Sequence, residues 1–342
     1  MGYKSLDEII GRNDLFQQNR VHADGVAPGQ PAKTATLDLS FLTTSSGASG
    51  PSSARVAQAP HNDGYVLDDE ILEDAAVQKC IAEEGTLTIK KSIINTNRAV
   101  GARVGGAVAA QYGDSGFAGT LTLDLEGSAG QSFGAFVVGG VHLRLVGEAN
   151  DYVAKSISGG EISIMPPPGS GFAAEDAIIA GNTCLYGATG GKVYINGRAG
   201  ERFAVRNSLG ETVVEGTGDH CCEYMTGGCV VVLGRVGRNV GAGMTGGLGY
   251  FLDEDGTFPS KVNGEIVSMQ RVITKAGENQ LKTLITEHVA KTGSPKGARI
   301  LADWSTMFGK FWQLVPPSEA NTPEAAEVDA AADAAIAKAV GA

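Results

Sequence analysis

A glycine pattern at Gly241–Gly246, with the sequence GAGMTG, has the G-x-G-x-x-G spacing that binds dinucleotide phosphates in many enzymes. That chemistry requires the glycines to open a helix, because amide groups at the helix N-terminus hold the pyrophosphate. Here a strand-like run, Gly247–Leu252, follows at once. A P-loop is excluded at Gly191, because Val193 stands where the motif needs Ser or Thr. We therefore interpret GAGMTG as a structural corner, with nucleotide binding as the alternative.

Three adjacent residues, His220, Cys221 and Cys222, have side chains that could bind a metal ion or act as a nucleophile. A zinc site needs about four ligands, and no second Cys/His pair lies nearby in the sequence. Neighbouring strand residues point to opposite faces, so we expect one cysteine inside the fold and the other outside. The five cysteines lack C-x-x-C spacing, which predicts free thiols in a reducing intracellular compartment.

Four charged residues could form a polysaccharide-cleaving site on a strand face: Asp151, Arg206, Asp219 and Glu223. Such a site needs paired carboxylates, and the linear sequence shows no acids stacked on successive repeats. The same side chains could form a solvated or partner-facing surface. We therefore predict no catalytic, cofactor-binding or metal-binding residue on this chain, and keep carbohydrate cleavage as a third hypothesis behind the two given below.

The overall composition excludes several classes of protein. The formal net charge of −11 over 342 residues argues against a nucleic-acid-binding surface, which needs clustered Lys and Arg. No apolar run approaches the roughly 18 residues of a transmembrane helix. Residues 1–20 show no targeting signal, so we expect a location in the cytoplasm or the plastid stroma.

Glycine is the unusual residue, with 49 in the chain and 29 of them between positions 119 and 249. A glycine repeatedly precedes a short β-rich run, at steps of 18 to 21 residues with a single step of 31. The long step contains Pro166–Pro168 and Gly169–Ala174, which we interpret as a loop inserted into one repeat. The seven runs are Thr120–Glu126, Val141–Val146, Glu161–Met165, Lys192–Asn196, Glu211–Glu215, Cys229–Leu233 and Leu248–Leu252.

A fixed period near 19 residues indicates a repeat architecture, in which each unit buries its core against its neighbours. Apolar and polar residues alternate in Val141–Val146, as in a half-buried strand. The pattern predicts an all-β fold, a single-stranded right-handed parallel β-helix of about seven coils, with flanking α-helices at both ends. A second apolar segment follows each strand and predicts a second short strand, at Gln131–Phe136, Asp151–Ile157, Glu201–Arg206 and Asn239–Met244.

Four regions follow from these patterns. Residues 1–67 form an N-terminal extension whose Ser45–Ser53 stretch reads as a flexible linker. Residues 68–273 form the glycine-rich β-helix domain, with core repeats over 119–252, preceded by a helix at Asp69–Glu84. Residues 274–316 form a C-terminal helical cap, including a helix at Glu278–Lys291. Residues 317–342 form an acidic, alanine-rich tail for which helix and disorder remain open.

The amino-acid sequence of the repeats resembles that of the C-terminal GXGXG domain of the glutamate synthase large (alpha) subunit. The resemblance is closest at residues 181–191 (GNTCLYGATGG) and 200–208 (GERFAVRNS), and it continues through 222–228 and 241–247. Residues 3–12 and 293–315 also resemble segments of that family, at its junction with the flavin-binding domain and at its C-terminal end. Residues 41–67 and the alanine-rich tail show no recognisable resemblance to that family.

The resemblance implies a non-catalytic right-handed β-helix, serving as a structural subunit or separated C-terminal domain of a glutamate synthase. In that family the domain positions the amidotransferase and FMN synthase domains for ammonia channelling, so that glutamine and 2-oxoglutarate yield glutamate. An N-terminal cysteine hydrolyses glutamine there, and FMN and an iron–sulfur cluster lie in a central barrel. We expect this chain to start after those parts, so its cofactors are none, with FMN and the cluster on partner chains.

A second hypothesis places the same repeats outside glutamate synthesis. The formylmethanofuran dehydrogenase subunit carries this repeat class, so an orphan GXGXG β-helix could act as a scaffold subunit of another large complex. Both hypotheses predict protein partners, no nucleic acid and no transmembrane segment. Unmatched residues 41–67 and the unmatched tail favour the second hypothesis, whereas the matches near both ends favour the first.

Overall fold

The computed structural model describes residues 2–16, 37–43 and 64–327, and the chain divides into two units, Met1–Gly64 and Tyr65–Ala342. The linker expected at Ser45–Ser53 and the tail beyond residue 327 lie outside the described residues. No helix in the described ranges is long and apolar enough to cross a membrane. The described residues of the first unit form three short helices, η1 (Leu6–Glu8), η2 (Asn13–Leu15) and α1 (Ser40–Thr43).

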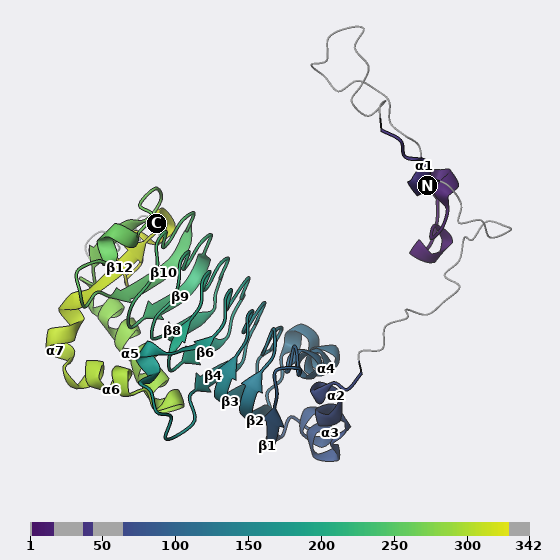
Figure 1. The fold of residues 1–342 in the computed structure, drawn as a ribbon, viewed down its shortest axis with the longest axis horizontal. Helices are drawn as coiled ribbons and strands as arrows, with labels where there is room; N and C mark the ends of the chain where they lie inside the picture. Colours follow the sequence, from purple (N-terminus) through teal and green to yellow (C-terminus); the bar gives the residue numbers. More distant parts are fainter. Residues whose placement is uncertain (1, 17–36, 44–63, 328–342) are drawn as a thin grey trace, which may run out of the picture. The chain divides into compact units, whose positions relative to one another are not determined.

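The second unit is built on a 12-stranded, mostly parallel sheet, whose main path runs β1-β2-β3-β4-β6-β8-β9-β10-β12-β11 (Figure 1). All seven predicted β-rich runs are confirmed as strands of this path, β2 to β4, β6 and β8 to β10. The strands are β1 (Thr86–Ile93), β2 (Thr120–Ala129), β3 (Val141–Ala149), β4 (Glu161–Met165), β5 (Ile178–Ala180), β6 (Lys192–Ile195), β7 (Arg198–Ala199), β8 (Glu211–Val214), β9 (Thr226–Val232), β10 (Gly246–Leu252), β11 (Ser268–Arg271) and β12 (Phe311–Val315).

The expected all-β class, a right-handed parallel β-helix of about seven coils, is wrong, because the described residues combine this sheet with seven α-helices in an α/β fold. The all-β prediction fails on the outward face of the sheet, which is the face that points away from the interior of the stacked repeats. On β2 and β3 that face is polar, but from β6 onward it carries Tyr194, Val213 and Val231, all fully buried. An apolar outward face must be covered, and helices α5 (Lys275–Thr292) and α6 (Pro295–Ala302) supply residues to the same core cluster.

The strands of the main path pair in register, with one irregularity between β9 and β10, where the register shifts between Gly246 and Leu248. Neighbouring strands are parallel as far as β10, and β12 and β11 are added antiparallel. One Cα-paired column runs through all ten strands of the main path: Lys90, Asp124, Arg144, Ser163, Tyr194, Val213, Val231, Tyr250, Gln313 and Gln270. The predicted alternation in Val141–Val146 is confirmed, because Val141, Leu143 and Leu145 are buried.

Helices cover the two ends and part of one face of the sheet (Figure 1). The single helix predicted at Asp69–Glu84 is wrong, because Asp74 ends α2 and its carboxylate caps α3 by accepting the Ala76 N–H at 2.8 Å. The helix predicted at Glu278–Lys291 is confirmed as α5, which ends before Gly293. The helices are α2 (Leu67–Glu73), α3 (Ala75–Ala82), α4 (Ala102–Tyr112), α5 (Lys275–Thr292), α6 (Pro295–Ala302) and α7 (Trp304–Met307).

The second segment of each repeat is a turn with alternating left-handed residues, so the predicted second strands are wrong. In the repeat of Arg202, the N–H groups of Arg202 and Arg206 donate to the following repeat, and the Ala204 N–H donates to the preceding one. These bonds hold non-glycine residues in a strained backbone region. Six triads have φ between 54° and 73°: 132/134/136, 152/154/156, 183/185/187, 202/204/206, 220/222/224 and 239/241/243.

Candidate functional site

The GAGMTG segment lies in the last of these turns. Gly241 and Gly243 are its left-handed residues, with φ of 73° and 67°. The chain continues into strand β10 at Gly246 rather than into a helix, so no helix N-terminus faces the glycines. A Cβ on Gly246 would lie 2.2 Å from the Thr226 carbonyl oxygen, which shows that this glycine permits close stacking on β9. The glycines therefore form a stacking corner, as the sequence indicated.

The expectation of one inward and one outward cysteine is wrong, because Cys221 and Cys222 are both fully buried, with their Sγ atoms 3.7 Å apart. The left-handed φ of 60° at Cys222 turns both side chains inward, which strict strand alternation would not allow. Hydrogen bonding to Cys221 and burial raise the pKa of the Cys222 thiol well above its ordinary value. His220 instead pairs with Asn239 at 3.0 Å. No metal-binding group of three His, Cys, Asp or Glu occurs in the described residues.

The charged residues considered for polysaccharide cleavage are used in the corners of the stack. One Asp151 carboxylate oxygen accepts the Asn182 N–H at 2.8 Å, and Asp219 accepts the Arg238 N–H at 2.9 Å. Hydrogen bonds from Arg238 lower the pKa of Asp219. Arg206 lies over the Tyr224 ring, 5.9 Å from its centroid. Asp151 and Asp219 therefore each join one repeat to the next, whereas Glu223 contributes its backbone carbonyl, which accepts the Arg206 N–H at 3.0 Å.

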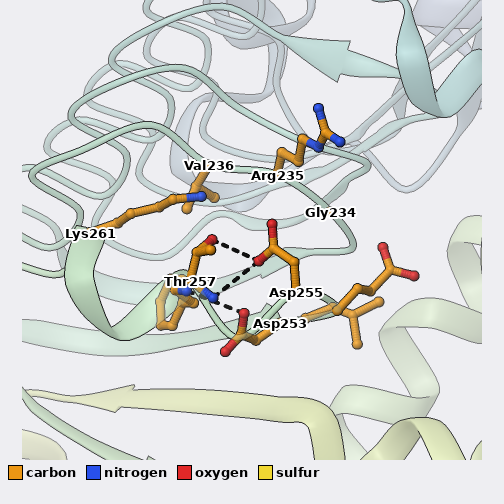
Figure 2. Close-up of a pocket in the computed structure, with 10 residues that line it drawn as sticks. Gly234, Arg235, Val236, Asp253, Asp255, Thr257 and Lys261 are labelled. Atoms are coloured by element: carbon orange, nitrogen blue, oxygen red, sulfur yellow. Dashed lines mark hydrogen bonds between the residues drawn. The ribbon is translucent and has the colours of Figure 1, made fainter.

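A small cavity of about 160 Å³ opens where the loop after β10 passes the corner at Gly234 (Figure 2). Asp255 accepts hydrogen bonds from Thr257, at 3.1 Å from its N–H and 2.7 Å from its hydroxyl, and these bonds lower the pKa of Asp255. Lys261 and Arg235 also line the cavity, as Figure 2 shows.

The other two carboxylates of this lining, Asp253 and Glu254, also have partners, and Glu254 pairs with Lys296 at 2.9 Å. Asp253 accepts the Phe258 N–H at 3.2 Å and the Trp312 Nε1–H at 3.1 Å. Both aspartates therefore hold the loop in place, and the Thr257 hydroxyl is engaged by Asp255. The lining contains both acidic and basic side chains and could accommodate a small polar ligand. Asp253 and Asp255, however, accept hydrogen bonds that shape the loop and are not arranged to transfer protons.

One buried polar cluster was missed by sequence reasoning. Glu215, directly after β8, is 1% exposed and accepts a hydrogen bond from Ser294, while His288 of α5 lies 3.4 Å away. Ser294 also caps α6 by accepting the Gly297 N–H at 2.8 Å. Ser294-Pro295 was a visible helix-start signal, but its partner Glu215 lies 79 residues away in the sequence, and nothing local indicates that pairing.

Comparison with known proteins identifies a family model and several relatives that match this chain. The family model described as the GXGXG motif matches residues 68–317. The chain is 57% identical over 325 residues to a protein named ferredoxin-dependent glutamate synthase 2 from Synechocystis sp.. It is 56% identical over 326 residues to the chloroplastic ferredoxin-dependent glutamate synthase of Spinacia oleracea, and 53% identical over 324 residues to that of Pyropia yezoensis. Each match covers 95% of this chain and 20% of the relative, so the chain spans about a fifth of their length.

Proposed function

The chain belongs to the GXGXG motif family, and from its similarity to glutamate synthases we propose that it is a non-catalytic structural element of such an enzyme. Its role would be to hold the amidotransferase and FMN synthase domains at a fixed separation while glutamine and 2-oxoglutarate are converted to glutamate. The FMN and the iron–sulfur cluster would be held by those other domains. Protein domains are therefore the proposed partners of this chain.

The Cα-paired column that runs through all ten strands of the main path is the observation that carries the proposal. Nine steps between strands at about 4.8 Å each correspond to a span of about 43 Å. The turns reinforce this spacing, because the Arg202 and Ala204 N–H groups bond to opposite neighbouring repeats, at 2.8 Å each. A stack bonded in both directions resists bending and stretching, which is the mechanical property that a spacer between two sites requires.

Changing the number of repeats tests the spacer role in the complete glutamate synthase that contains or assembles with this segment. Duplicating residues 210–227 would add one strand and one turn to the stack. We expect glutaminase activity and ammonia-dependent glutamate formation to persist, while glutamine-dependent glutamate formation falls at least tenfold. Each of the two active sites would remain functional, but the separation and orientation between them would have changed.

An insertion of equal length in the loop after β4 provides the matched control, because that loop lies outside the stacked strands. It should leave glutamine-dependent activity near that of the unmodified enzyme. Full coupling in the duplicated variant would contradict the spacer role. Flavin absorbance or glutaminase activity in the purified chain would contradict the assignment of chemistry to other domains.

A further inference from the structure

Strand β1 is the terminal strand of the sheet's main path, and within the described residues only one of its two edges is paired. Its residues, Thr86–Ile93, pair with β2 over their whole length. Figure 1 shows β1 as the last strand at that end of the stack. The opposite end is closed differently, because β12 and β11 are antiparallel there and Gln270 of β11 donates to the carbonyl of the buried Ala325. An unpaired edge strand offers a row of backbone groups to another chain.

The backbone groups on the free edge of β1 follow from its pairing with β2. The Thr120 N–H donates to the Gly85 carbonyl at 2.8 Å. In a parallel pair, alternate residues direct both their N–H and their C=O group to the same neighbour, so the odd-numbered residues of β1 face β2. Residues 86, 88, 90 and 92 therefore direct their N–H and C=O groups away from β2. None of these groups has a hydrogen-bond partner within the described residues.

Two apolar side chains of β1 also lack a neighbour on this edge. Leu87 and Ile89 are in register with Leu121 and Leu123 of β2 and share their inward face. The two β2 side chains are 0% exposed, whereas Leu87 and Ile89 are only half-buried. A further strand with apolar residues at these two positions would bury the remaining area, as β2 does on the other side.

On the outward face, the charges of one column indicate which residue would come next. Lys90, Asp124 and Arg144 are in register, and Arg144 pairs with Asp124 at 2.7 Å. Lys90 is exposed and forms no ion pair within the described part of the chain, while the neighbouring Lys91 pairs with Glu70. The column therefore alternates in sign as far as Lys90, and an acidic side chain opposite Lys90 would continue the alternation.

We propose that the free edge of β1 binds an extended segment of a partner protein domain as an additional strand. The segment carries apolar residues opposite Leu87 and Ile89 and an acidic residue opposite Lys90. Main-chain hydrogen bonds hold the segment, and the three side-chain positions select its sequence. The proposal rests on the proposed function in one respect, since it takes the partner to be another domain of the same glutamate synthase. Strand addition would attach this end of the stack to that domain through the backbone itself.

Amide hydrogen exchange tests the edge without any substitution. In the full chain alone, the Thr88 and Lys90 amides should exchange rapidly, whereas the Leu87 and Ile89 amides face β2 and should exchange slowly as internal controls. In the complete glutamate synthase that contains or assembles with this segment, exchange at Thr88 and Lys90 should slow at least tenfold. Mass spectrometry with fragmentation that resolves single amides measures both samples. Slow exchange of these two amides in the chain alone, or unchanged exchange in the complete enzyme, would overturn the proposal.

A peptide with the sequence of residues 119–127, GTLTLDLEG, probes the sequence preference, because this segment includes the strand that pairs with the other edge of β1. We expect saturable binding to the full chain by calorimetry, at least tenfold weaker when lysine replaces the aspartate at the position of Asp124. Lys90→Glu should reverse this preference, whereas Lys79→Glu, an equal change of charge on α3, should leave it unchanged. Thr88→Pro removes one outward N–H and should weaken binding at least tenfold, with circular dichroism showing that the chain folds.

The outcomes separate the possible occupants of the edge. Absence of saturable binding, or equal binding of the two peptides, would reject the proposal. Self-association of the full chain that Thr88→Pro abolishes would identify a second copy as the occupant and overturn the choice of a partner domain. The repeat duplication tests the spacer role separately. Uncoupling in the duplicated enzyme with unprotected Thr88 and Lys90 amides would retain the spacer role and reject the edge contact, and protected amides with full coupling would do the reverse.

Discussion

His288 of α5 and Glu215 lie 3.4 Å apart, Nε2 to Oε1, with neither side chain exposed to solvent. The same Glu215 oxygen accepts the Ser294 hydroxyl, and Ser294 caps α6. The Glu215 carboxylate thus connects α5 and α6 to the end of strand β8. It attaches these helices to the part of the sheet whose outward face is apolar.

Removing the histidine should destabilise the protein strongly. His288→Ala leaves a buried carboxylate without one of its partners, so we expect the free energy of unfolding to fall by about 3 kcal/mol. Urea unfolding followed by circular dichroism measures the change. His220→Ala is the matched control, because His220 is partly exposed and loses only its Asn239 contact, with an expected loss of about 1 kcal/mol. Equal losses in the two variants would contradict the importance of the buried pair.

Asp68 should be an essential cap for α4. Its carboxylate is 1% exposed and accepts the N–H groups of Gly101 at 2.9 Å and Arg103 at 2.8 Å. Asp68→Ala would orphan these donors at the helix start, so we expect a loss of about 2 kcal/mol in urea unfolding. The neighbouring Asp69→Ala removes only an exposed pair with Arg103 and should cost less than about 1 kcal/mol. A larger loss for Asp69→Ala than for Asp68→Ala would refute this view.

Much of the sheet could be predicted from the sequence, because strand positions follow local signals. A glycine before an alternating run predicts where each strand starts, and Val141–Val146 behaves as its alternation indicates. The turns could not be predicted, since residues such as Arg202 and Cys222 adopt left-handed φ only because their N–H groups bond to neighbouring repeats. That information is non-local. The α/β class was missed for a related reason, since helical cover is needed only where Tyr194 and its neighbours face outward.

The candidate sites also differ in whether local sequence signals were enough to predict them. The structural reading of Gly241–Gly246 needed only the strand that follows it, and that strand is visible in the sequence. The buried cluster around Glu215 depends on contacts between residues far apart in the chain, because Ser294 lies 79 residues and His288 lies 73 residues from Glu215. Only the helix-start pair Ser294-Pro295 gave a local sign of it.

The thiols should be unreactive in the folded protein. All five cysteines are buried, and burial raises the pKa of Cys184 to about 12. Because the thiolate is the reactive form, we expect Ellman's reagent at about pH 8 to label the native chain at least a hundredfold more slowly than the unfolded chain. Unfolding in guanidinium should release five equivalents. Rapid labelling of a native thiol would contradict this prediction, and Cys80 of α3, at 5% exposed, is the first position to replace by serine in order to locate the reactive thiol.

Gly147 should be among the least replaceable residues of the stack. Its φ is 153°, and a Cβ there would lie 1.7 Å from the Gly127 carbonyl oxygen of the preceding strand. Gly147→Ala must push two strands apart, so we expect a loss of about 4 kcal/mol or failure to fold. Gly106→Ala in α4 is the control, because its Cβ meets nothing within 4 Å and alanine favours helices, with an expected gain of about 0.5–1 kcal/mol. Thermal unfolding of both variants makes the comparison, and tolerance of Gly147→Ala would show that the strands are stacked less closely.

Glu287 should make the attachment of α5 depend on pH. Burial acts to raise its pKa, but hydrogen bonds from Lys192 and Tyr194 and the charge of Lys192 outweigh that effect, so the pKa is lowered. A depressed carboxyl pKa contributes stability that is present above the unfolded-state value, about 4.3, and is lost as the pH falls through the folded-state value.

Glu287→Gln should therefore cost about 1 kcal/mol at neutral pH, since both partners are partly exposed, and the difference from the unmodified chain should shrink as the pH falls below the unfolded-state value of about 4.3. Urea unfolding at a series of pH values measures this difference. Glu83→Gln, in a surface pair whose charged atoms are 4.0 Å apart, controls for the loss of one negative charge and should cost less than about 0.5 kcal/mol. If the Glu287→Gln difference grew as the pH fell, Lys192 could not be stabilising the ionised carboxylate, and the other contacts of α5, such as the His288–Glu215 pair, would have to hold the helix to the sheet.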